Sequence, residues 1–356
     1  MPAAMPAAVA EVEIELEESK PAPPPPPAAR MIQILGGFWV ARALHAVAKL
    51  GIADLLADGP KSVEQLAAAT GTHAPSLYRL LRGAASSEVF REISPRVFES
   101  TPMGDTLRSG TGSLKAVFTS IGGEEHYDAW GDIVHAVTTG ETAFDHHFGK
   151  GIWQFFDENP SNAKVFNQAM TDFTHAIDQA LLKAYDFGKF KHIVDVGGGH
   201  GAVLAAILKA HPRVSGTVFD QPNVAEGACK AISEQNLSAR CAAVGGDFFQ
   251  SVPTGGDAYL MKFIIHDWDD EKSIRILKNI RKASPAGTKV LLVETLVPEG
   301  NGPDFSKLMD LNMLVMTGGR ERTEQEYAAL FAAAGFKLTG VTPTESVFSV
   351  IEAVAV

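Results

Sequence analysis

Residues 192–211 read HIVDVGGGHGAVLAAILKAH, and this stretch decides the fold. A short apolar run comes first, glycines follow at 197, 198, 199 and 201, and the segment after them has the apolar periodicity of a helix. Glycine permits positive φ and a close approach of the backbone to a ligand, and a helix N-terminus presents free N–H groups. The pattern predicts a strand, a ligand-binding loop and a helix. Four glycines within five residues disfavour the alternative, a tight turn that binds nothing.

Short apolar runs alternate with helical patterns after residue 191. The runs are HIVDV (192–196), GTVFD (216–220), AYLMKF (258–263) and KVLLVE (289–294). Such alternation is typical of βαβ units, in which helices cover both faces of a parallel sheet. We therefore expect an α/β fold with a Rossmann-like core over residues 191–356. A helical, aromatic-rich part over residues 111–190 precedes this core in the same domain.

Upstream of these runs, residues 31–110 have a mostly helical pattern. Two short predicted helices around Gly71 and the hairpin-like REISPRVFESTPMG outline a winged helix-turn-helix, for which DNA binding is the first hypothesis. A DNA-binding face needs a basic stripe, yet residues 61–108 hold six basic and five acidic side chains. We therefore predict a winged-helix-like dimerisation domain and a homodimer. The predicted interface is an apolar helix that contains Phe38, Trp39, Leu44 and Val47.

The composition of the 356 residues excludes several classes of protein. The formal charge of −11 argues against a nucleic-acid partner, and we find no stretch of about 18 apolar residues that would predict a membrane span. Cys229 and Cys241 form neither a CxxC motif nor a ligand set with a histidine, which fits a reducing, cytoplasmic location. Residues 1–30 are rich in Pro and Ala, lack a secretory pattern and are expected to form a disordered tail.

Acidic residues near the predicted strand ends narrow the choice of ligand. Asp220 can accept hydrogen bonds from ribose hydroxyls, which suits NAD and S-adenosylmethionine equally. Asp195 lies just before the glycines, and GGDFF (245–249) offers an acid for the amine of an adenine and a ring for its flat face. These features favour S-adenosylmethionine, with its product S-adenosylhomocysteine. An NAD-linked oxidoreductase is the alternative.

Six motifs in order carry a resemblance to a known family: DVGGGHG, FDQPNV, GGDFF, FIIHDWDDE, VETLVPEG and GGRERTEQEY. Together they resemble the S-adenosylmethionine-dependent, cation-independent O-methyltransferases of the caffeic acid and hydroxyindole type, over nearly the whole chain after residue 30. The resemblance implies an N-terminal dimerisation domain and a Rossmann-like methyltransferase domain. It also implies cofactor contacts at Gly197, Asp220, Asp247, Phe248 and Lys262.

His266 follows one predicted strand and Glu294 ends the next. Ligands bind outside the carboxyl ends of the strands in open α/β sheets, so both residues are expected on the rim that holds Gly197. A histidine there can take the proton of a phenolic hydroxyl as its oxygen attacks an activated methyl group. A carboxylate on the other ring nitrogen would fix the tautomer. We predict His266 as the general base and Glu294 as its partner.

The resemblance implies a second acid at Glu321. From the residues alone, Glu321 can equally be a charge near the N-terminus of a helix, because Thr323 and Glu326 have the spacing of a capping box. The sequence thus favours Glu294 over Glu321 as the partner of the histidine.

No metal site is predicted. His146 and His147 are adjacent, so we expect their side chains to diverge, and no carboxylate cluster completes a ligand set. The acids of DWDDE (267–271) could suggest magnesium. Asp269, Asp270 and Glu271 are better explained as charges that stabilise the positive N-terminal end of the helix that follows them.

The acceptor is a small hydroxylated, aromatic molecule if the resemblance holds. It implies a lining of Trp130, Phe148, Trp153, Phe156, Met170, Phe263, Asp267, Asn312, Met313 and Met316. Plant members that act on phenylpropanoids often carry Asn-Pro where this chain has Met316 and Thr317, which argues against a phenylpropanoid acceptor. The expected function is methyl transfer to a hydroxyl group. A winged-helix regulator that senses S-adenosylmethionine is the non-enzymatic alternative.

Overall fold

The computed structural model describes residues 25–110 and 112–356. The expected disordered tail lies outside the described residues up to residue 24. Its predicted end at residue 30 is wrong, because helix α1 (Pro27–Lys49) begins at the last of five consecutive prolines. Proline is favoured in the first turn of a helix, and the Ala-Ala-Arg that follows has high helix propensity.

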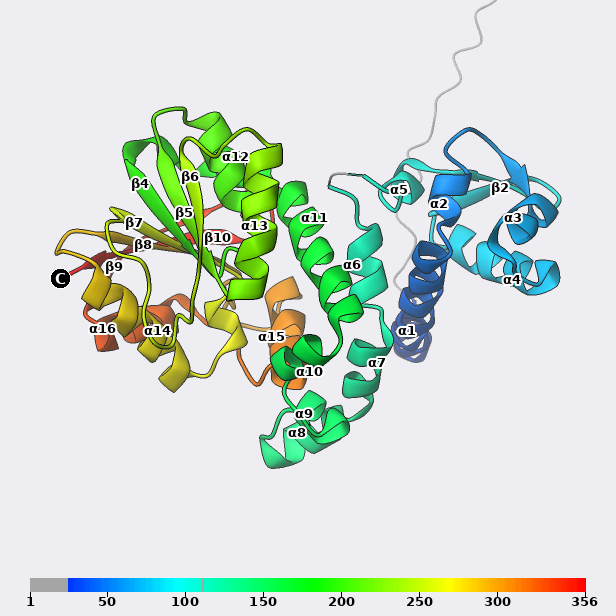
Figure 1. The fold of residues 1–356 in the computed structure, drawn as a ribbon. Helices are drawn as coiled ribbons and strands as arrows, with labels where there is room; N and C mark the ends of the chain where they lie inside the picture. Colours follow the sequence, from blue (N-terminus) through cyan, green and yellow to red (C-terminus); the bar gives the residue numbers. More distant parts are fainter. Residues whose placement is uncertain (1–24, 111) are drawn as a thin grey trace, which may run out of the picture. The chain divides into compact units, whose positions relative to one another are not determined.

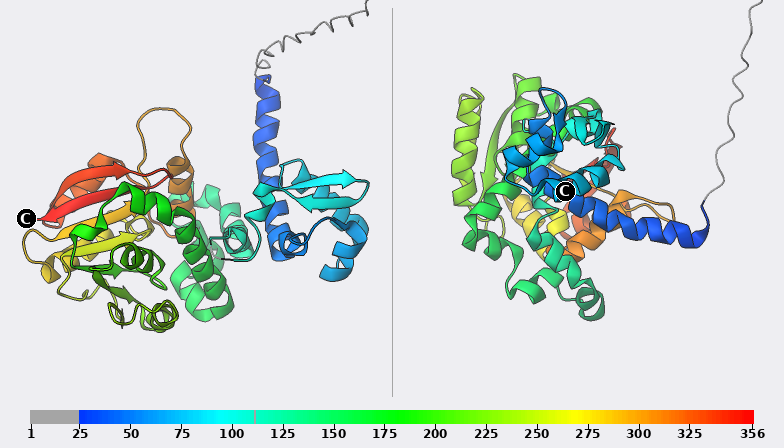
Figure 2. Two further views of the ribbon diagram at one scale, coloured as in Figure 1. Left: turned by 90° about the horizontal axis from the view of Figure 1, so that it is seen from above. Right: turned by 90° about the vertical axis from the view of Figure 1, so that its right-hand side faces the viewer.

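The described part of the chain divides after Trp39 into two units, residues 25–39 and the described residues from 40 to 356. Figure 2 shows α1, which contains the division, as a single helix. Six large apolar side chains of α1 are between 47% and 68% exposed: Met31, Ile32, Ile34, Leu35, Phe38 and Trp39. Among the described helices, α1 is long and apolar enough, by length and composition, to cross a membrane, which corrects the prediction that the chain has no such apolar stretch. A helix that packs against another protein chain can share both properties.

A winged-helix-like arrangement follows, as predicted. Its helices are α2 (Ile52–Leu55), α3 (Val63–Thr70) and α4 (Ala74–Ala85). Its three-stranded sheet has the order β1–β3–β2, formed by β1 (Lys61–Ser62), β2 (Phe90–Ser94) and β3 (Val97–Ser100). Ser62 opens α3 with a capping box, and Gly71 ends it in the left-handed conformation that favours glycine. The two short helices predicted around Gly71 are therefore confirmed.

The next part is helical and rich in aromatic residues, also as predicted. The short helix α5 (Pro102–Asp105) still lies within residues 31–110. The helices of the next part are α6 (Lys115–Ser120), α7 (Glu124–Gly131), α8 (Ile133–Thr139), α9 (Ala143–Phe148), α10 (Ile152–Glu158) and α11 (Pro160–Ala184). Side chains from α7, α9 and α10 form one hydrophobic cluster with the end of α15 (Phe305–Met316). This cluster joins residues more than 150 positions apart.

A seven-stranded sheet in the order β6–β5–β4–β7–β8–β10–β9 forms the centre of the C-terminal part (Figure 1). The strands are β4 (His192–Val196), β5 (Ser215–Asp220), β6 (Cys241–Gly245), β7 (Ala258–Lys262), β8 (Lys289–Glu294), β9 (Phe336–Pro343) and β10 (Ser349–Ala355). The four predicted strands are confirmed. The sheet is not wholly parallel, because β10 runs antiparallel to both β8 and β9. A short connection can join antiparallel strands without a crossover helix.

Helices cover both faces of this sheet. One hydrophobic core contains residues of α12 (Ala202–Ala210) and α13 (Pro222–Glu234), and a second contains residues of α14 (Asp270–Ala283) and α16 (Glu324–Ala333). Figure 1 shows the two helix pairs on opposite sides of the strands. Asp269 caps α14 by accepting the N–H of Lys272, and Asp270 and Glu271 lie in the first turn of this helix. The predicted role of these three acids at the start of a helix is therefore confirmed.

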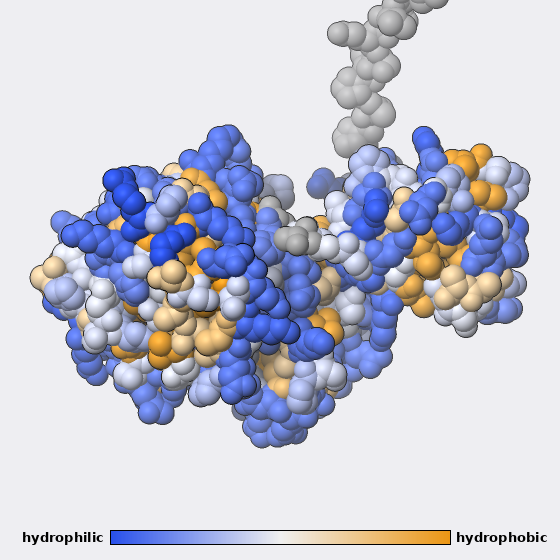
Figure 3. Space-filling view, turned by 45° about the horizontal axis from the view of Figure 1, so that its top comes forward, coloured by the Kyte–Doolittle hydropathy of each residue, from blue (hydrophilic) through white to orange (hydrophobic). Residues whose placement is uncertain are grey.

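Hydrophilic residues dominate the face shown in Figure 3, and hydrophobic residues lie between them in separate patches. The parallel strands β4, β7 and β8 direct their carboxyl ends to one rim, where the candidate site lies.

Candidate functional site

His266 lies in a short 3-10 helix (Ile265–Asp267) just after β7, and Glu294 is the last residue of β8. These strands are parallel neighbours, so the two side chains meet at the carboxyl rim. Glu321 reaches the same place from the loop before α16. Nδ1 of His266 donates a hydrogen bond to Oε1 of Glu321 over 2.7 Å and lies 3.5 Å from Oε2 of Glu294. All three side chains are buried.

The geometry reverses the order of the two acids. Oε1 of Glu294 accepts the backbone N–H groups of Ile264 (3.1 Å) and Ile265 (3.0 Å), and its Oε2 has no hydrogen-bond partner among the described residues. Glu294 therefore holds the backbone near His266, while Glu321 holds the ring itself. The sequence favoured Glu294 because it ends a neighbouring strand, whereas nothing local indicates that Glu321, 55 residues from His266, contacts the ring.

Thr295 and Asp310, which sequence reasoning missed, fix Glu321 in turn. The Thr295 hydroxyl donates to Oε2 of Glu321 over 2.6 Å, and the backbone N–H of Glu321 donates to Oδ1 of Asp310 over 2.9 Å. Both carboxylate oxygens of Glu321 are thus occupied, one by the ring of His266 and one by a buried hydroxyl. The carboxylate has a single orientation as a result.

The next residue, Arg322, ties two loops together. Its side chain is fully buried and donates to the carbonyls of Ile265 (3.1 Å) and Trp268 (2.8 Å), on either side of His266. It also pairs with the Asp270 carboxylate over 2.8 Å. Arginine can bridge several carbonyls at once because its five N–H donors are fixed in a fork. The loop that holds His266 and the loop that holds Glu321 are therefore joined.

Burial and the nearby carboxylates act in opposite directions on His266. Burial lowers its pKa, because it disfavours the charged ring, but Glu294, Asp267 and Glu321 together raise the pKa to about 10. Burial raises the pKa of Glu294 to about 7 and that of Asp267 to about 6. In the chain alone, the three carboxylates thus favour the protonated form of the His266 ring.

The donor atoms of His266, Glu294 and Glu321 lie within 4.8 Å of one another, the one such group in the described part of the chain. A small cation would find three ligands there. We interpret the group as an acid–base set, because His266 and Glu321 already share a 2.7 Å hydrogen bond and Thr295 occupies the other oxygen. The absence of a metal stays a prediction.

The glycine loop between β4 and α12 has the predicted backbone. Gly197, Gly199 and Gly201 have φ angles of 72°, 56° and 77°. A Cβ atom at Gly198 would lie 2.6 Å from Oδ2 of Asp195, so the backbone passes directly over that carboxylate. Both oxygens of Asp195 are buried without a hydrogen-bond partner among the described residues, and burial raises its pKa to about 7. Buried polar groups are normally paired, so this carboxylate fits a site that receives a polar, cationic ligand group.

Lys262 and Phe263 connect the glycine loop with His266. Burial lowers the pKa of Lys262 to about 8, although Asp195 and Glu294 oppose this shift. Nζ of Lys262 lies 3.6 Å from the centroid of the Phe263 ring, which stacks on the His266 imidazole with centroids 5.6 Å apart. The φ angle of Phe263 is 57°, a strained value for a bulky residue. The ring predicted to line the acceptor site therefore also contacts the cofactor-side lysine.

Five predicted acceptor-site residues belong to the hydrophobic cluster of α7, α9, α10 and α15: Trp130, Phe148, Trp153, Phe156 and Met316. Nε1 of Trp130 donates to Oδ1 of Asn312 over 3.0 Å, which fixes the orientation of that amide. Phe156, Met313 and Met316 are buried, which is the position of core residues. Met170 lies in α11, and Oδ1 of Asp267 lies 3.7 Å from Nε2 of His266.

Trp268 was not assigned from the sequence, although it lies two residues after His266. Its ring centroid is 6.1 Å from that of Phe248 and 6.2 Å from that of Trp153. Its Nε1 is buried without a partner among the described residues. The indole thus connects the predicted adenine side with the predicted acceptor side. Its place in the HDWDD motif was the available signal.

Comparisons with known proteins decide the family. Residues 130–337 match the O-methyltransferase domain, and residues 32–110 match the O-methyltransferase dimerisation domain. This chain belongs to the O-methyltransferase family. It is similar to a phenazine O-methyltransferase of Lysobacter antibioticus, with 47% identity over 91% of this chain and 95% of that protein. The structure of human N-acetylserotonin methyltransferase in complex with S-adenosylmethionine has a TM-score of 0.86 and 28% identity over 93% of this chain and 98% of the other.

Some relatives of this O-methyltransferase family member methylate nitrogen. Phenazine-1-carboxylate N-methyltransferase of Pseudomonas aeruginosa is 32% identical over 87% of this chain and 92% of that protein. The chain is accordingly a methyltransferase related to enzymes of small aromatic natural products, and S-adenosylmethionine is bound in solved relatives. These findings favour the predicted methyltransferase over the NAD-linked alternative.

The remaining cofactor candidates of this O-methyltransferase lie around the glycine loop. Oδ2 of Asp220 accepts the N–H of Gly199 over 2.8 Å, and burial raises the pKa of Asp220. Asp247 is exposed and accepts the N–H of Phe249 over 2.8 Å, next to the half-buried ring of Phe248. With Gly197 and Lys262, these residues suit a ligand that has hydroxyl groups, an aromatic base and a cationic end. Their contacts with S-adenosylmethionine remain proposals.

The expectation that His146 and His147 diverge is wrong. Nδ1 of His146 lies 3.0 Å from Oδ2 of Asp132, and Nδ1 of His147 lies 3.5 Å from the same oxygen. Both histidines lie in the last turn of α9, and Asp132 is the residue just before α8. His135 stacks on His146 with centroids 3.7 Å apart. These side chains connect α8 with α9.

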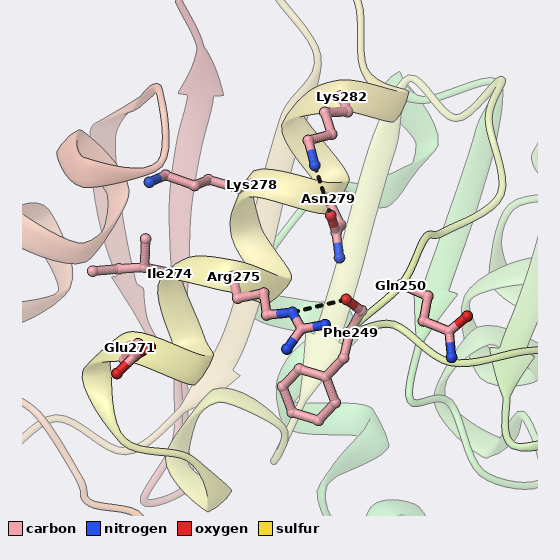
Figure 4. Close-up of a pocket in the computed structure, with 8 residues that line it drawn as sticks. All are labelled: Phe249, Gln250, Glu271, Ile274, Arg275, Lys278, Asn279 and Lys282. Atoms are coloured by element: carbon pink, nitrogen blue, oxygen red, sulfur yellow. Dashed lines mark hydrogen bonds between the residues drawn. The ribbon is translucent and has the colours of Figure 1, made fainter.

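An open pocket beside α14 lies apart from the candidate site. Its lining is Phe249, Gln250, Glu271, Ile274, Arg275, Lys278, Asn279 and Lys282 (Figure 4). Arg275 donates to the carbonyl of Phe249 over 3.0 Å, and Lys282 donates to Oδ1 of Asn279 over 3.3 Å. Neither His266 nor a glycine of the loop lines this pocket, so we assign it no part in methyl transfer.

Proposed function

We propose that this chain transfers the methyl group of S-adenosylmethionine to a hydroxyl of a small aromatic acceptor, with His266 as the general base. The observation that carries the proposal is the buried His266–Glu321 hydrogen bond of 2.7 Å at the rim that also holds the glycine loop. It leaves Nε2 of His266 as the ring nitrogen that can face an acceptor. Phe263 links this ring to Lys262 on the cofactor side.

The cofactor supplies a methyl group that is already activated on a sulfonium, and it leaves as S-adenosylhomocysteine. The acceptor oxygen forms the new O–CH₃ bond as the S–CH₃ bond breaks, and its proton moves to Nε2 of His266. Glu321 accepts the Nδ1 proton of the ring and stabilises the imidazolium that forms. A base must first be neutral. A second positive charge nearby lowers the pKa of an imidazole, so the cationic cofactor opposes the three carboxylates and favours the neutral ring.

An amine acceptor is the second candidate, because a relative 32% identical to this chain is named as an N-methyltransferase. Transfer to an amine needs the same alignment of nitrogen and methyl group, but a neutral amine is already nucleophilic. Loss of His266 should therefore affect an amine acceptor much less than a phenol. The two acceptor classes can be separated by this difference.

We also propose a homodimer, formed through residues 31–110 and the apolar side chains of α1, in a cytoplasmic enzyme. The match of residues 32–110 to a dimerisation domain and the exposed Ile34, Leu35 and Trp39 support the homodimer. The cytoplasmic location rests on the two unpaired cysteines. A monomer at micromolar concentration in light scattering, fully active, would contradict the dimer.

The experiment is a methyl-transfer screen with purified protein and S-adenosylmethionine. Acceptors are phenols, hydroxyindoles, flavonoids, hydroxylated phenazines and polyketide-type hydroxyls, each paired with an amine analogue of the same ring. Mass spectrometry of the products should show O-methylation that needs His266. Methylation of the amines alone, or turnover of hydroxyl acceptors unchanged in His266→Gln, would contradict the proposal.

A further inference from the structure

Thr295 lies one residue beyond the end of β8 and is 1% exposed. An isolated parallel bridge pairs the next residue, Leu296, with Arg322, and the N–H of Val297 donates to the carbonyl of Arg322 over 3.1 Å. These backbone contacts set residues 295–297 beside residues 320–322. They bring the hydroxyl of Thr295 to Oε2 of Glu321 at 2.6 Å.

Glu321 has two carboxylate oxygens and two side-chain donors, one on each. The Thr295 hydroxyl donates to Oε2, and Nδ1 of His266 donates to Oε1. A buried carboxylate oxygen without a donor is costly, and Oε2 of Glu294 nearby is already in that state. Removal of the hydroxyl would leave a second such oxygen within the same group. Glu321 would then turn toward another donor or become protonated, and either change weakens its hold on His266.

We propose that Thr295 is a positioning residue for the reaction: its hydroxyl orients Glu321, which in turn orients His266. This inference rests on the proposed function, because it assumes that His266 acts on the acceptor. Among the described residues, the Thr295 hydroxyl makes a hydrogen bond to Glu321 and none to His266 or to the glycine loop. Its effect should pass through Glu321 alone.

The variants Thr295→Val and Thr295→Ser separate the hydroxyl from the packing of the side chain. Valine has nearly the same shape without the hydroxyl, and serine keeps the hydroxyl without the methyl group. Because a hydrogen bond to a charged group contributes about 1.5–3 kcal/mol, Thr295→Val should lower kcat about 10-fold to 100-fold. Thr295→Ser should keep kcat within about 3-fold of wild type, because serine retains the hydroxyl that donates to Glu321. The KM of the acceptor and the Kd of S-adenosylhomocysteine should change little.

Thr288 provides a matched control at the other end of the same strand. It lies just before β8, is 4% exposed and has no side-chain hydrogen bond among the described residues. Thr288→Val therefore makes the same chemical change outside the candidate site. It should leave kcat unchanged.

A double-mutant cycle with Glu321→Gln tests the route of the effect. If Thr295 acts through Glu321, Thr295→Val should add little to the loss already caused by Glu321→Gln. Additive losses, or a Thr295→Ser variant as slow as Thr295→Val, would overturn the inference. If the valine variant does not fold, Thr295→Ala replaces it; because alanine lacks both the hydroxyl and the methyl group, its rate is compared with that of Thr295→Ser, which lacks only the methyl group.

The outcomes also separate this inference from the proposed function. If Glu321→Gln and His266→Gln both turn over like wild type, the proposed base is wrong and the inference falls with it. If both are impaired while Thr295→Val is not, the proposed base stands and the inference alone is overturned.

Discussion

His266 has one strong hydrogen-bond partner, Glu321, and lies among carboxylates that raise its pKa to about 10. A general base works in its neutral form, so the free enzyme should gain activity as pH rises toward that value. The carboxylates thus have two opposing effects: they fix the ring and stabilise the imidazolium product, but they also keep the ring protonated at neutral pH.

The variant Glu321→Gln should separate these effects. Removal of one negative charge lowers the pKa of His266, so the rising limb of kcat/KM against pH should move to lower pH. The plateau should fall, because the ring loses its 2.7 Å partner. Glu294→Gln should move the rising limb in the same direction. Its plateau rate should stay about 10-fold higher than that of Glu321→Gln, because Glu294 mainly holds the backbone.

The same acceptor must be used for all three proteins, so that its own ionisation is common to the profiles. A limb that moves to higher pH, or a larger loss of plateau rate in Glu294→Gln than in Glu321→Gln, would contradict the assignment of the two acids.

At the scale of elements, the segment before α16 is fixed to the loop after β7 by Arg322. The substitution Arg322→Met should leave the carbonyls of Ile265 and Trp268 without this buried donor. We expect the free energy of unfolding to fall by about 3 kcal/mol, in the range for breaking a buried ionic network. Urea denaturation measures the change.

Arg320 supplies the control. It pairs with Glu326 on the surface, where an exposed ion pair contributes less than about 1 kcal/mol, so Arg320→Met should have little effect on unfolding. Equal losses in the two variants would show that Arg322 is not a special support of this loop.

The elements that carry strong local signals could be predicted from the sequence. The strands β4 and β8 are each indicated by an apolar run with turn residues close to it in the sequence. The glycine loop follows directly from its glycines. The helix start at Thr323 follows from its capping box. The antiparallel β10 could not be predicted in the same way, because its direction depends on its pairing with strands β8 and β9.

The candidate site was predictable where it depends on strand ends and not where it depends on long-range packing. His266 and Glu294 lie at ends of neighbouring strands, so their meeting follows from the topology. Thr295 and Arg322 act through hydrogen bonds across the fold. Hydroxyl and guanidinium groups of this kind have no periodic signature in a sequence.

At the scale of the whole molecule, buried acids make stability depend on pH. The pKa of Asp195 is raised from 3.8 to about 7 and that of Glu294 from 4.5 to about 7, chiefly by burial. A folded-state pKa above the unfolded value gives stability that is fully present below the unfolded pKa and is lost as pH rises through the folded one. The protein without cofactor should therefore lose stability as pH rises from about 4 to about 7.

Thermal unfolding of the wild type and of Asp195→Asn at pH 5.5 and pH 8 tests this dependence. The amide cannot ionise, so the variant should lose less stability than the wild type over this interval, with a difference of about 3 kcal/mol or less. Equal pH dependence in the two proteins would contradict the burial of an unpaired, titrating Asp195.

Removal of metal ions tests the acid–base interpretation of His266, Glu294 and Glu321. Because His266 already shares a hydrogen bond with Glu321 and the other oxygen of Glu321 accepts the Thr295 hydroxyl, dialysis against a chelator should leave kcat unchanged, and added divalent ions should not raise it. A chelator-sensitive rate that returns with one added metal would identify the group as a metal centre.

The most direct test of the whole account is the turnover of His266→Gln at neutral pH, with saturating S-adenosylmethionine and a hydroxyl acceptor found in the screen. General-base catalysis contributes about 10²–10⁴-fold, so kcat should fall by that order while calorimetry shows unchanged binding of S-adenosylhomocysteine. The residual rate should rise at alkaline pH, where the phenolate forms unaided. Turnover close to that of the wild type at neutral pH would show that His266 is not the base.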